Sequence, residues 1–300
     1  MKGQQFEFDW VDAFTSQAFG GNACMVVYGA DDLSIEARLA LVRETSLSEC
    51  AFIVDSDKAD FGARYYLSEC EIPMAGHPTI ATVTSLLARG FVELMNGSVN
   101  FTLEVGAGVL PIQITKTSKG FNVRMTQMAP TFGIKFDSVE IANIYGLRAE
   151  DIMLPPQIVS TGTPVCIILL NSKDALRRAK LCDEHLGHFL SKNKTLYPNL
   201  MEPFLVTMGG ETKAGDTFSR LLMPGLGSPE DSFTGSATGC MAAFLWHYGL
   251  INTHKFIAEQ GHWLGRPGSA EVEVLGPSEE IFGINVSGYG FILMRGVLSV

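Results

Sequence analysis

Much of this chain alternates between apolar and polar residues with the two-residue period of half-buried strands. Phe6–Phe14 alternates in this way, and Ala23–Tyr28 is a continuous apolar run typical of a buried strand. Alternation over residues 101–115 and 119–128 predicts a hairpin around Thr117–Gly120. The chain is therefore expected to be rich in strands.

Helical spacing first appears after Ser34, a residue type that commonly caps helix N-termini. Ile35, Leu39 and Val42 form the apolar stripe of this helix, and Arg38 is expected to face solvent. Glu36 and Arg43 are expected to face solvent as well.

Two further helices each follow a loop that contains glycine. The longer loop, Gly225–Thr238, combines glycines, a proline and adjacent acids, and runs into the small and apolar residues 239–246. Residues 74–79 lead in the same way into a helix over residues 80–90. Unpaired backbone N–H groups and the helix dipole make such helix starts suitable for binding anions. Aligned without a gap, the two helices match at four pairs of residues: Gly76 with Gly235, Thr79 with Thr238, Leu86 with Leu245, and Gly90 with Gly249.

This match indicates a duplicated unit. We expect an N-terminal half, residues 1–129, and a C-terminal half, residues 130–300, whose last strand is a candidate to return to the first half. Each half would be a strongly curved, mostly antiparallel sheet around a buried central helix, so the predicted fold class is α+β. The two helix starts would then face a shared cleft.

Composition narrows the class of protein. The chain is 46% apolar and 18% charged, as expected of a well-cored globular protein, and its net charge of −10 argues against a nucleic-acid surface. The first ten residues contain no long apolar run, so no secretory signal is expected, and no window reaches the ~20 apolar residues of a membrane span. A cytoplasmic enzyme or binding protein is the default expectation.

The six cysteines are scattered singly, which argues against a disulfide framework or a metal site. Cys24, Cys50, Cys166 and Cys240 lie in apolar stretches and are expected to fill core space. Cys70, between Glu69 and Glu71, is the one candidate for a reactive thiol.

Glu49 is the only charged residue at the entrance of an otherwise apolar strand, Ser46–Val54. Burying a carboxylate costs several kcal/mol unless the group is paired or used, so its presence needs a reason. One reason is catalysis. The alternative is that Glu49 marks the strand edge and stays hydrated.

The two loops hold the other candidate groups, His77, Asp231 and Ser236. Each has a structural alternative, because His77 and Ser236 could cap the helices that they begin, and Asp231 could be a turn former. The paired glycines at 106 and 108 and at 225 and 227 do not stand between a parallel strand and a helix, so a dinucleotide site is not expected.

Four separated motifs, in this order, resemble the phenazine-biosynthesis PhzF-like family, which is similar in fold to diaminopimelate epimerase. The motifs are Val11–Asn22, Ser48–Phe52, Ala75–Thr79 and Glu230–Ala237, and the resemblance extends to the closing 261–268 segment and the final strands. It implies two diaminopimelate epimerase-like domains, no metal, no organic cofactor, and commonly a homodimer.

The resemblance also implies roles for particular residues. The proton-shuttling glutamate of the family falls on Glu49, the histidine after the first loop glycine falls on His77, and the acid of the Glu-Asp pair falls on Asp231. The catalytic candidates are thus Glu49, His77 and Asp231, and the substrate-binding candidates are Gly76, His77, Gly235 and Ser236. Two positions depart from the family pattern, which more often has proline at Ser232 and a smaller residue at Phe233.

Cofactor-independent racemases of this fold need a thiol on each face of the substrate. In this chain Ala75 and Thr234 stand before the two loop glycines, and neither can act as such a base. We therefore expect an isomerase in which Glu49 alone moves a proton, and with it double bonds, within a small cyclic or unsaturated carboxylate. The alternatives are an epimerase or racemase that uses Glu49 with another base, and a non-catalytic protein that binds a small ligand on the same fold.

Overall fold

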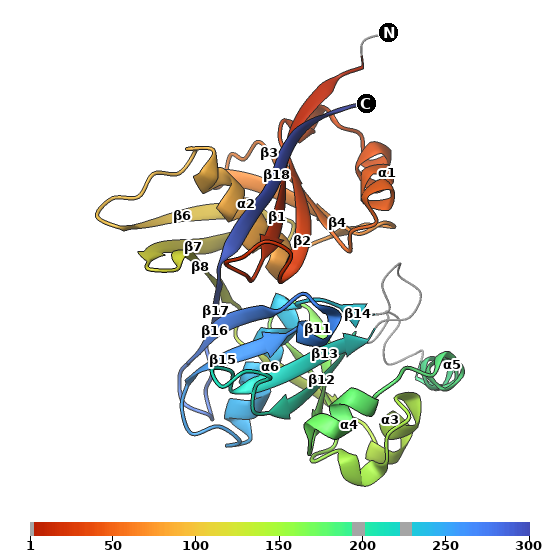
Figure 1. Ribbon diagram of the computed structural model, residues 1–300. Helices are drawn as coiled ribbons and strands as arrows, with labels where there is room; N and C mark the ends of the chain where they lie inside the picture. Colours follow the sequence, from red (N-terminus) through yellow and green to blue (C-terminus); the bar gives the residue numbers. More distant parts are fainter. Residues whose placement is uncertain (1–2, 194–201, 223–229) are drawn as a thin grey trace. The chain divides into compact units, whose positions relative to one another are not determined.

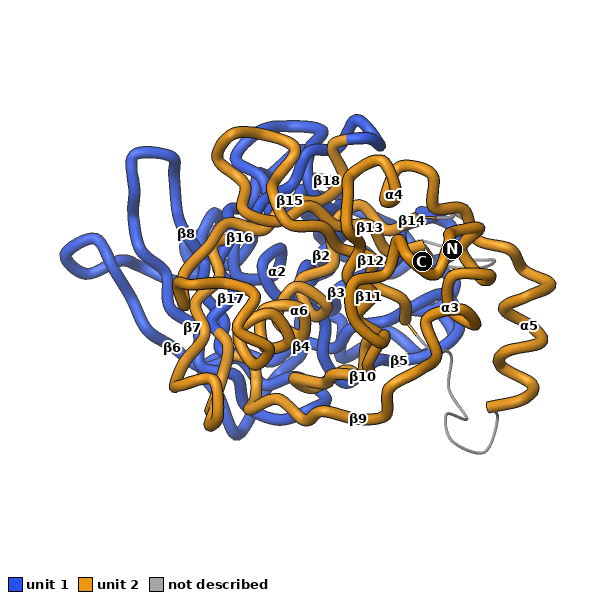
Figure 2. The backbone as a smooth tube through the Cα atoms, turned by 90° about the horizontal axis from the view of Figure 1, so that it is seen from below, with its two compact units in different colours: residues 1–126, 263–270, 285–300 blue, residues 127–262, 271–284 orange. Residues whose placement is uncertain are grey.

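The computed structural model describes residues 3–193, 202–222 and 230–300. These fall into two compact units, shown in Figures 1 and 2. Unit 1 is Met1–Thr126 with Trp263–Ala270 and Asn285–Val300, and unit 2 is Gln127–His262 with Glu271–Ile284. The glycine-rich part of the longer predicted loop, residues 225–229, lies outside the described residues.

Unit 1 is built mainly of strands, with one central and one peripheral helix. Its elements are β1 (Gln5–Ala13), β2 (Asn22–Val27), η1 (Ala30–Asp32), α1 (Ile35–Thr45), β3 (Cys50–Val54), β4 (Phe61–Tyr66), β5 (Glu71–Ile72), α2 (Gly76–Ala88), β6 (Ser98–Val105), β7 (Gly108–Thr117), most of β8 (Gly120–Gln127) and of β17 (Gly283–Gly288), and β18 (Gly290–Ser299).

Unit 2 repeats the plan and adds small helices. Its elements are β9 (Thr131–Lys135), α3 (Ser138–Ile144), η2 (Ala149–Asp151), β10 (Gln157–Ser160), β11 (Pro164–Leu170), α4 (Lys173–Arg178), α5 (Asp183–Lys192), β12 (Glu202–Met208), β13 (Thr217–Leu222), β14 (Glu230–Asp231), α6 (Gly235–His247), β15 (Lys255–Gln260) and most of β16 (Gly268–Leu275), while η3 (His262–Leu264) spans the boundary.

The sheet of each unit wraps around one buried helix, α2 in unit 1 and α6 in unit 2 (Figure 2). Most strand pairs are antiparallel, but β2–β3 and β4–β6 in unit 1, like β11–β12 and β13–β15 in unit 2, are parallel. Both helices are apolar on nearly every face, as expected of helices enclosed by strands. The α+β prediction is confirmed.

The predicted match between the two central helices holds residue by residue. α2 and α6 are both 13 residues long and begin at Gly76 and Gly235. The hydroxyl groups of Thr79 and Thr238 each donate to the carbonyl oxygen four residues earlier. Leu86 and Leu245 are fully buried, and Gly90 and Gly249 both end their helices with positive φ, where glycine carries no steric penalty.

Arg38 corrects one prediction about α1. Ser34 caps the helix as expected, its hydroxyl accepting from the Ala37 N–H. Arg38 is not in solvent but buried, and its guanidinium donates to the carbonyl oxygens of Ala30 and Leu33. Apolar spacing predicts a solvent position for Arg38 because it does not show that nearby carbonyl groups satisfy a buried cation. Ile35, predicted in the stripe, is 56% exposed.

The predicted hairpin contains three strands, where the sequence pattern predicts two. The 101–115 segment is not one strand but parts of two, β6 and β7, joined at Gly106 and Ala107. β7 then pairs with β8 around the expected Thr117–Gly120 turn. A Cβ atom at Gly106 would lie 2.9 Å from the Cα atom of Pro73, so this turn requires glycine.

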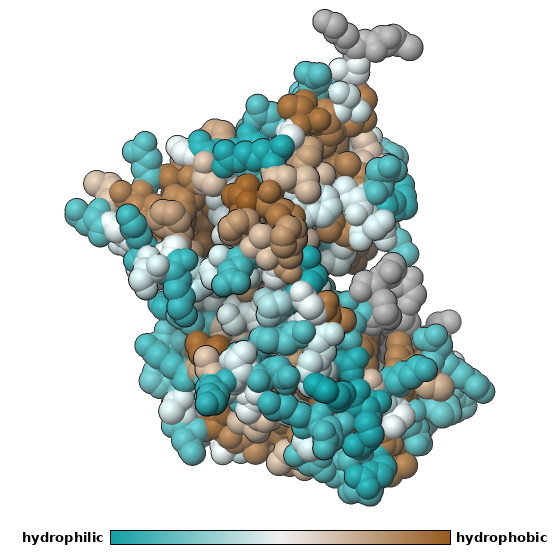
Figure 3. Space-filling view, viewed as in Figure 1, coloured by the Kyte–Doolittle hydropathy of each residue, from teal (hydrophilic) through white to brown (hydrophobic). Residues whose placement is uncertain are grey.

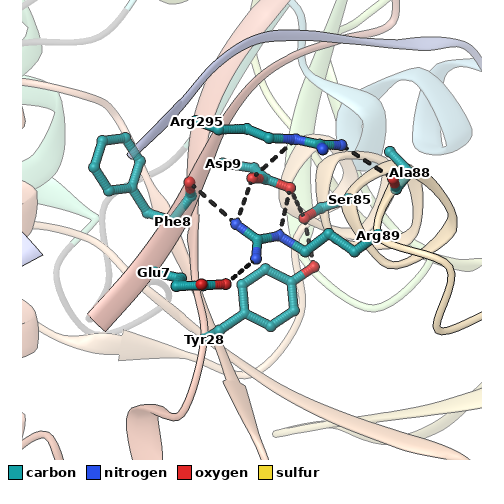
Figure 4. Close-up of polar contacts among 8 residues, drawn as sticks. All are labelled: Glu7, Phe8, Asp9, Tyr28, Ser85, Ala88, Arg89 and Arg295. Atoms are coloured by element: carbon teal, nitrogen blue, oxygen red, sulfur yellow. Dashed lines mark hydrogen bonds and ion pairs between the residues drawn. The ribbon is translucent and has the colours of Figure 1, made fainter. Parts of the chain in front are cut away.

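A buried ion-pair network ties the C-terminal end of α2 to the first and last strands of unit 1 (Figure 4). Asp9 is fully buried on β1, and its carboxylate accepts hydrogen bonds from Ser85 Oγ (2.6 Å) and from Nε and Nη2 of Arg89 (3.0 and 2.7 Å). Arg295 on β18 lies 3.5 Å from the same carboxylate, and Arg89 also pairs with the exposed Glu7. The network compensates the cost of burying Asp9.

On the outer face of unit 1, Figure 3 shows apolar side chains among the polar ones. On β18, Phe291, Met294 and Val297 are 37%, 47% and 56% exposed. Within the described residues, no helix is both long and apolar enough to span a membrane.

Candidate active site

Glu49 directly precedes β3, and its side chain lies on the side of the sheet that faces α2. The next residue on that side of the strand, Ala51, pairs with Tyr65, whose hydroxyl contacts Thr79 of α2. The Glu49 side chain is 18% exposed, and its Oε2 atom is buried. Glu49 is therefore not a hydrated residue at the strand edge.

Beside it lies His77, the second residue of α2. The N-cap of α2 is Ala75, which has no side-chain cap, so His77 does not cap the helix. The His77 side chain is 5% exposed, and its Nδ1 atom lies 3.7 Å from Oε2 of Glu49. α2 and the strand before β3 thus bring two of the predicted site residues together.

Hydrogen bonding determines the tautomer of His77. The side-chain amide of Asn22, the first residue of β2, lies 3.2 Å from His77 Nδ1. The amide nitrogen can only donate, so Nδ1 accepts and the ring proton is on Nε2. Nε2 is buried without a hydrogen-bond partner among the described residues. His77 therefore presents a buried N–H donor.

Burial lowers the pKa of His77 from its ordinary value of 6.5 to about 3. The ring is neutral at physiological pH, so its contact with Glu49 is not an ion pair there. Glu49 thus has a polar neighbour that does not hold it as an anion, a suitable setting for a group that must both accept and return a proton.

The N-terminus of α2 contributes further donors. Gly76 and His77 belong to the first turn, whose backbone N–H groups have no partner within the helix. No acidic side chain lies in the first turn of α2 or of α6. The positive ends of both helix dipoles are therefore not neutralised by their own first-turn side chains.

The unit 2 candidates gather around the start of α6. Thr234 is its N-cap residue and donates from its hydroxyl to Oδ2 of Asp231 at 2.6 Å. Gln260, at the end of β15, donates from its amide to the carbonyl oxygen of Asp231 at 2.9 Å and accepts from the Thr234 N–H at 3.0 Å. These bonds hold Asp231 in place, and the side chain of the N-cap residue Thr234 does not cap α6.

Gly235 and Ser236 are the first two residues of α6 and are buried. The Gly235 carbonyl oxygen accepts from the amide of Gln127 at 2.9 Å, which anchors this turn. A Cβ atom at Gly239 would lie 1.8 Å from Oε1 of Gln127, so the glycine there makes the contact possible.

Two supporting residues were missed from the sequence, Asn22 and Gln260. Asn22 begins a strand and Gln260 ends one, and each is a polar residue next to a glycine, which is the one signal that could have found them. The four apolar-stretch cysteines are buried as predicted, and Cys70 is exposed. Over the described parts of the chain, no group of three or more His, Cys, Asp or Glu side chains is placed to hold a metal ion.

We expect His77 to remain neutral well below pH 6.5. Since the unfolded chain takes up this proton near pH 6.5 and the folded chain only near pH 3, the free energy of unfolding should fall as the pH drops through that window. Nitrogen-15 NMR should show the Nε2–H tautomer at pH 5, and His77→Gln should reduce the pH dependence of unfolding. A ring that titrates near pH 6.5 would contradict this assignment.

An enclosed carboxyl group beside a neutral imidazole at a helix start suits enzymes that transfer protons by general acid–base catalysis. Comparison with known proteins names the family. The sequence matches the model of the phenazine biosynthesis-like proteins, PhzC-PhzF, over residues 11–296, so the chain belongs to that family.

Its relatives are similar along nearly their whole length. The "Uncharacterized isomerase YddE" of Escherichia coli (strain K12) is 32% identical over 301 residues, with 95% of both chains covered. The trans-2,3-dihydro-3-hydroxyanthranilate isomerase of Pseudomonas aeruginosa is 28% identical over 298 residues, with 95% of this chain and 96% of that protein covered. A crystal structure of a PhzF-family phenazine biosynthesis protein of Bacillus anthracis superposes with a TM-score of 0.86 and 27% identity, covering 99% of this chain and 100% of the other. The predicted PhzF-family isomerase is confirmed.

Proposed function

We propose that this isomerase moves one proton, and with it double bonds, within a small cyclic or unsaturated carboxylate, with Glu49 as the only acid–base group. The observation that carries the proposal is the largely buried Glu49 carboxyl group, 3.7 Å from an imidazole that is itself uncharged. Such a group can change its protonation state without breaking an ion pair to His77.

The proposed step balances without any other reactant. The Glu49 carboxylate removes a proton from one carbon, and the electron pair of that C–H bond moves into the adjacent unsaturated system. Glu49, now protonated, returns the proton to another carbon on the same face, and the double bonds shift by one position. No oxidant, reductant or leaving group is needed.

Other predicted residues would stabilise the negative charge that develops in this step. The Nε2–H group of His77 and the backbone N–H groups at Gly76 are donors of the kind that bind a carboxylate or an enolate oxygen. In unit 2, Asp231 is proposed as a catalytic residue and Gly235 and Ser236 as substrate-binding residues, with Thr234 and Gln260 holding Asp231 in position.

The relatives suggest the substrate class. The P. aeruginosa relative is named for the isomerisation of trans-2,3-dihydro-3-hydroxyanthranilate, a cyclic amino carboxylate with ring double bonds. We therefore propose a cyclic, partly unsaturated carboxylate for this chain. The homodimer, the cytoplasmic location and the absence of a cofactor stay predictions.

The test is incubation of the protein in heavy water with a panel of cyclic, unsaturated and amino carboxylates, read by NMR. We expect a product with shifted double bonds. Deuterium enters only when the Glu49 proton exchanges with the solvent before its return, so we expect any label at the carbon that receives the proton. Inversion at a single carbon without bond migration would replace the proposal by the epimerase alternative. Binding of a carboxylate without exchange or conversion would favour a non-catalytic protein.

A further inference from the structure

The pairing register of the strands identifies a counterpart of Glu49 in unit 2. Arg64 in β4 and Arg220 in β13 occupy the same place in the two units, because each stands two residues before the end of its strand and pairs with an acid of the next short strand. Phe52 lies opposite Arg64, and Leu205 lies opposite Arg220. Glu49 and Glu202 both come three residues before these partners. Glu202 is therefore the counterpart of Glu49.

Glu202 also points to the same side of its sheet as Asp231. On β12, Glu202 and Phe204 are two residues apart and so share a face. Phe204 lies opposite Leu221, and Leu221 lies opposite Asp231. In unit 1 the corresponding face is the one that contacts α2, and in unit 2 it is the α6 face. The position that matches Asp231 in unit 1 is Ile72, so of these matched positions only those of unit 2 place two acids on one face.

Among the described residues, the neighbouring Arg220, Glu230 and Cys240 do not balance the charge of this pair. Arg220 and Glu230 are offset by one residue from Leu221 and Asp231, face the opposite side of the sheet, and pair with each other at 2.7 Å. On α6, burial raises the pKa of the Cys240 thiol to about 11, so that group is neutral. Burial, and then the nearby Asp231 carboxylate, raise the pKa of Glu202 from 4.5 to about 7.

We propose that Glu202 is a further functional residue of this enzyme: with Asp231 it forms a coupled carboxyl pair that holds one proton, and it thereby sets the charge next to the start of α6. While Glu202 holds the proton, the pair carries one negative charge. When the proton leaves, the charge doubles, and an approaching carboxylate is repelled more strongly. Glu202 is thus a positioning residue that acts through Asp231, and its effect on substrate rests on the function proposed above.

The pair can be tested without any substrate. The full chain, with carbon-13 in the carboxyl groups of Asp and Glu, is titrated by NMR from pH 4 to 9, and Glu202→Gln identifies the Glu202 resonance. We expect that resonance to titrate near pH 7 and to move to lower pH in Asp231→Asn. Glu184→Gln, which removes an exposed acid of unit 2, should leave it in place. A titration near pH 4.5, or one that Asp231→Asn does not shift, would overturn the pair.

A second measurement links the pair to binding. With a carboxylate that the heavy-water panel shows to be converted, KM should rise severalfold above pH 7, and Glu202→Gln should abolish that rise. An unchanged rise would show that Glu202 does not set the charge that the substrate meets. Because the titration uses protein alone, the pair can stand if no carboxylate is converted, and conversion can stand if the pair does not titrate as expected.

Discussion

Replacing Glu49 with glutamine is expected to lower turnover by about a hundredfold or more, because the amide can neither remove nor return a proton. Glutamine keeps the size and hydrogen-bonding reach of the side chain, so His77 and Asn22 keep their positions. The measurement is the rate of product formation and of deuterium incorporation in heavy water with a converted carboxylate.

Glu44→Gln is the matched control, since it removes an exposed acid from α1, five residues earlier. It should keep the turnover of the unchanged protein, and both variants should unfold at the same temperature as that protein. Near-normal turnover in Glu49→Gln would refute the single-glutamate mechanism and would direct the search to another base.

Of the substitutions proposed for this protein, Asp9→Asn should lower the free energy of unfolding the most. The exchange leaves Arg89, whose side chain is 15% exposed, without its main anion, and removing one partner of a buried ion pair costs about 3 kcal/mol or more. For a unit of this size that corresponds to a fall of roughly 10 °C in the unfolding temperature. Thermal unfolding followed by circular dichroism measures it.

Glu7→Gln tests whether the burial of Asp9 causes the expected loss of stability. Glu7 pairs with the same Arg89, but its side chain is 63% exposed, and exposed ion pairs contribute about 1 kcal/mol at most. This variant should therefore unfold within a few degrees of the unchanged protein. If both variants lost stability equally, the charge of Arg89 and not the burial of Asp9 would account for the effect.

The fold was largely predictable because it depends on local patterns that repeat. The sequence shows two helices that start with glycine and match at further positions. In the structure, α2 and α6 both begin with glycine and are both followed by a glycine of positive φ. The predictions fail at two places. One is a buried cation whose hydrogen-bond acceptors lie in another segment, and the other is a turn inside an alternating stretch. The sequence pattern predicts Arg38 in solvent, because it does not show that the carbonyl groups of Ala30 and Leu33, before α1, accept from the guanidinium. The pattern of residues 101–115 predicts one strand, because alternation continues across the turn at Gly106.

The site was predictable in its residues but not in its chemistry. Glu49 could be singled out as a lone acid before an apolar strand, and His77, Asp231 and Ser236 by their place at helix starts. Only the tertiary structure shows that Asn22, 55 residues away, accounts for the tautomer of His77. It also shows that the strand register brings Glu202 to the face of Asp231.

By itself, the sequence determined the duplicated fold, the family and the acid on which the proposed reaction depends. Those features depend on the types of side chain and on their spacing along the chain. The three-dimensional structure alone decided which groups are charged. The protonation of a buried side chain depends on the water that it loses and on the dipoles around it, and both are supplied by residues far away in the sequence.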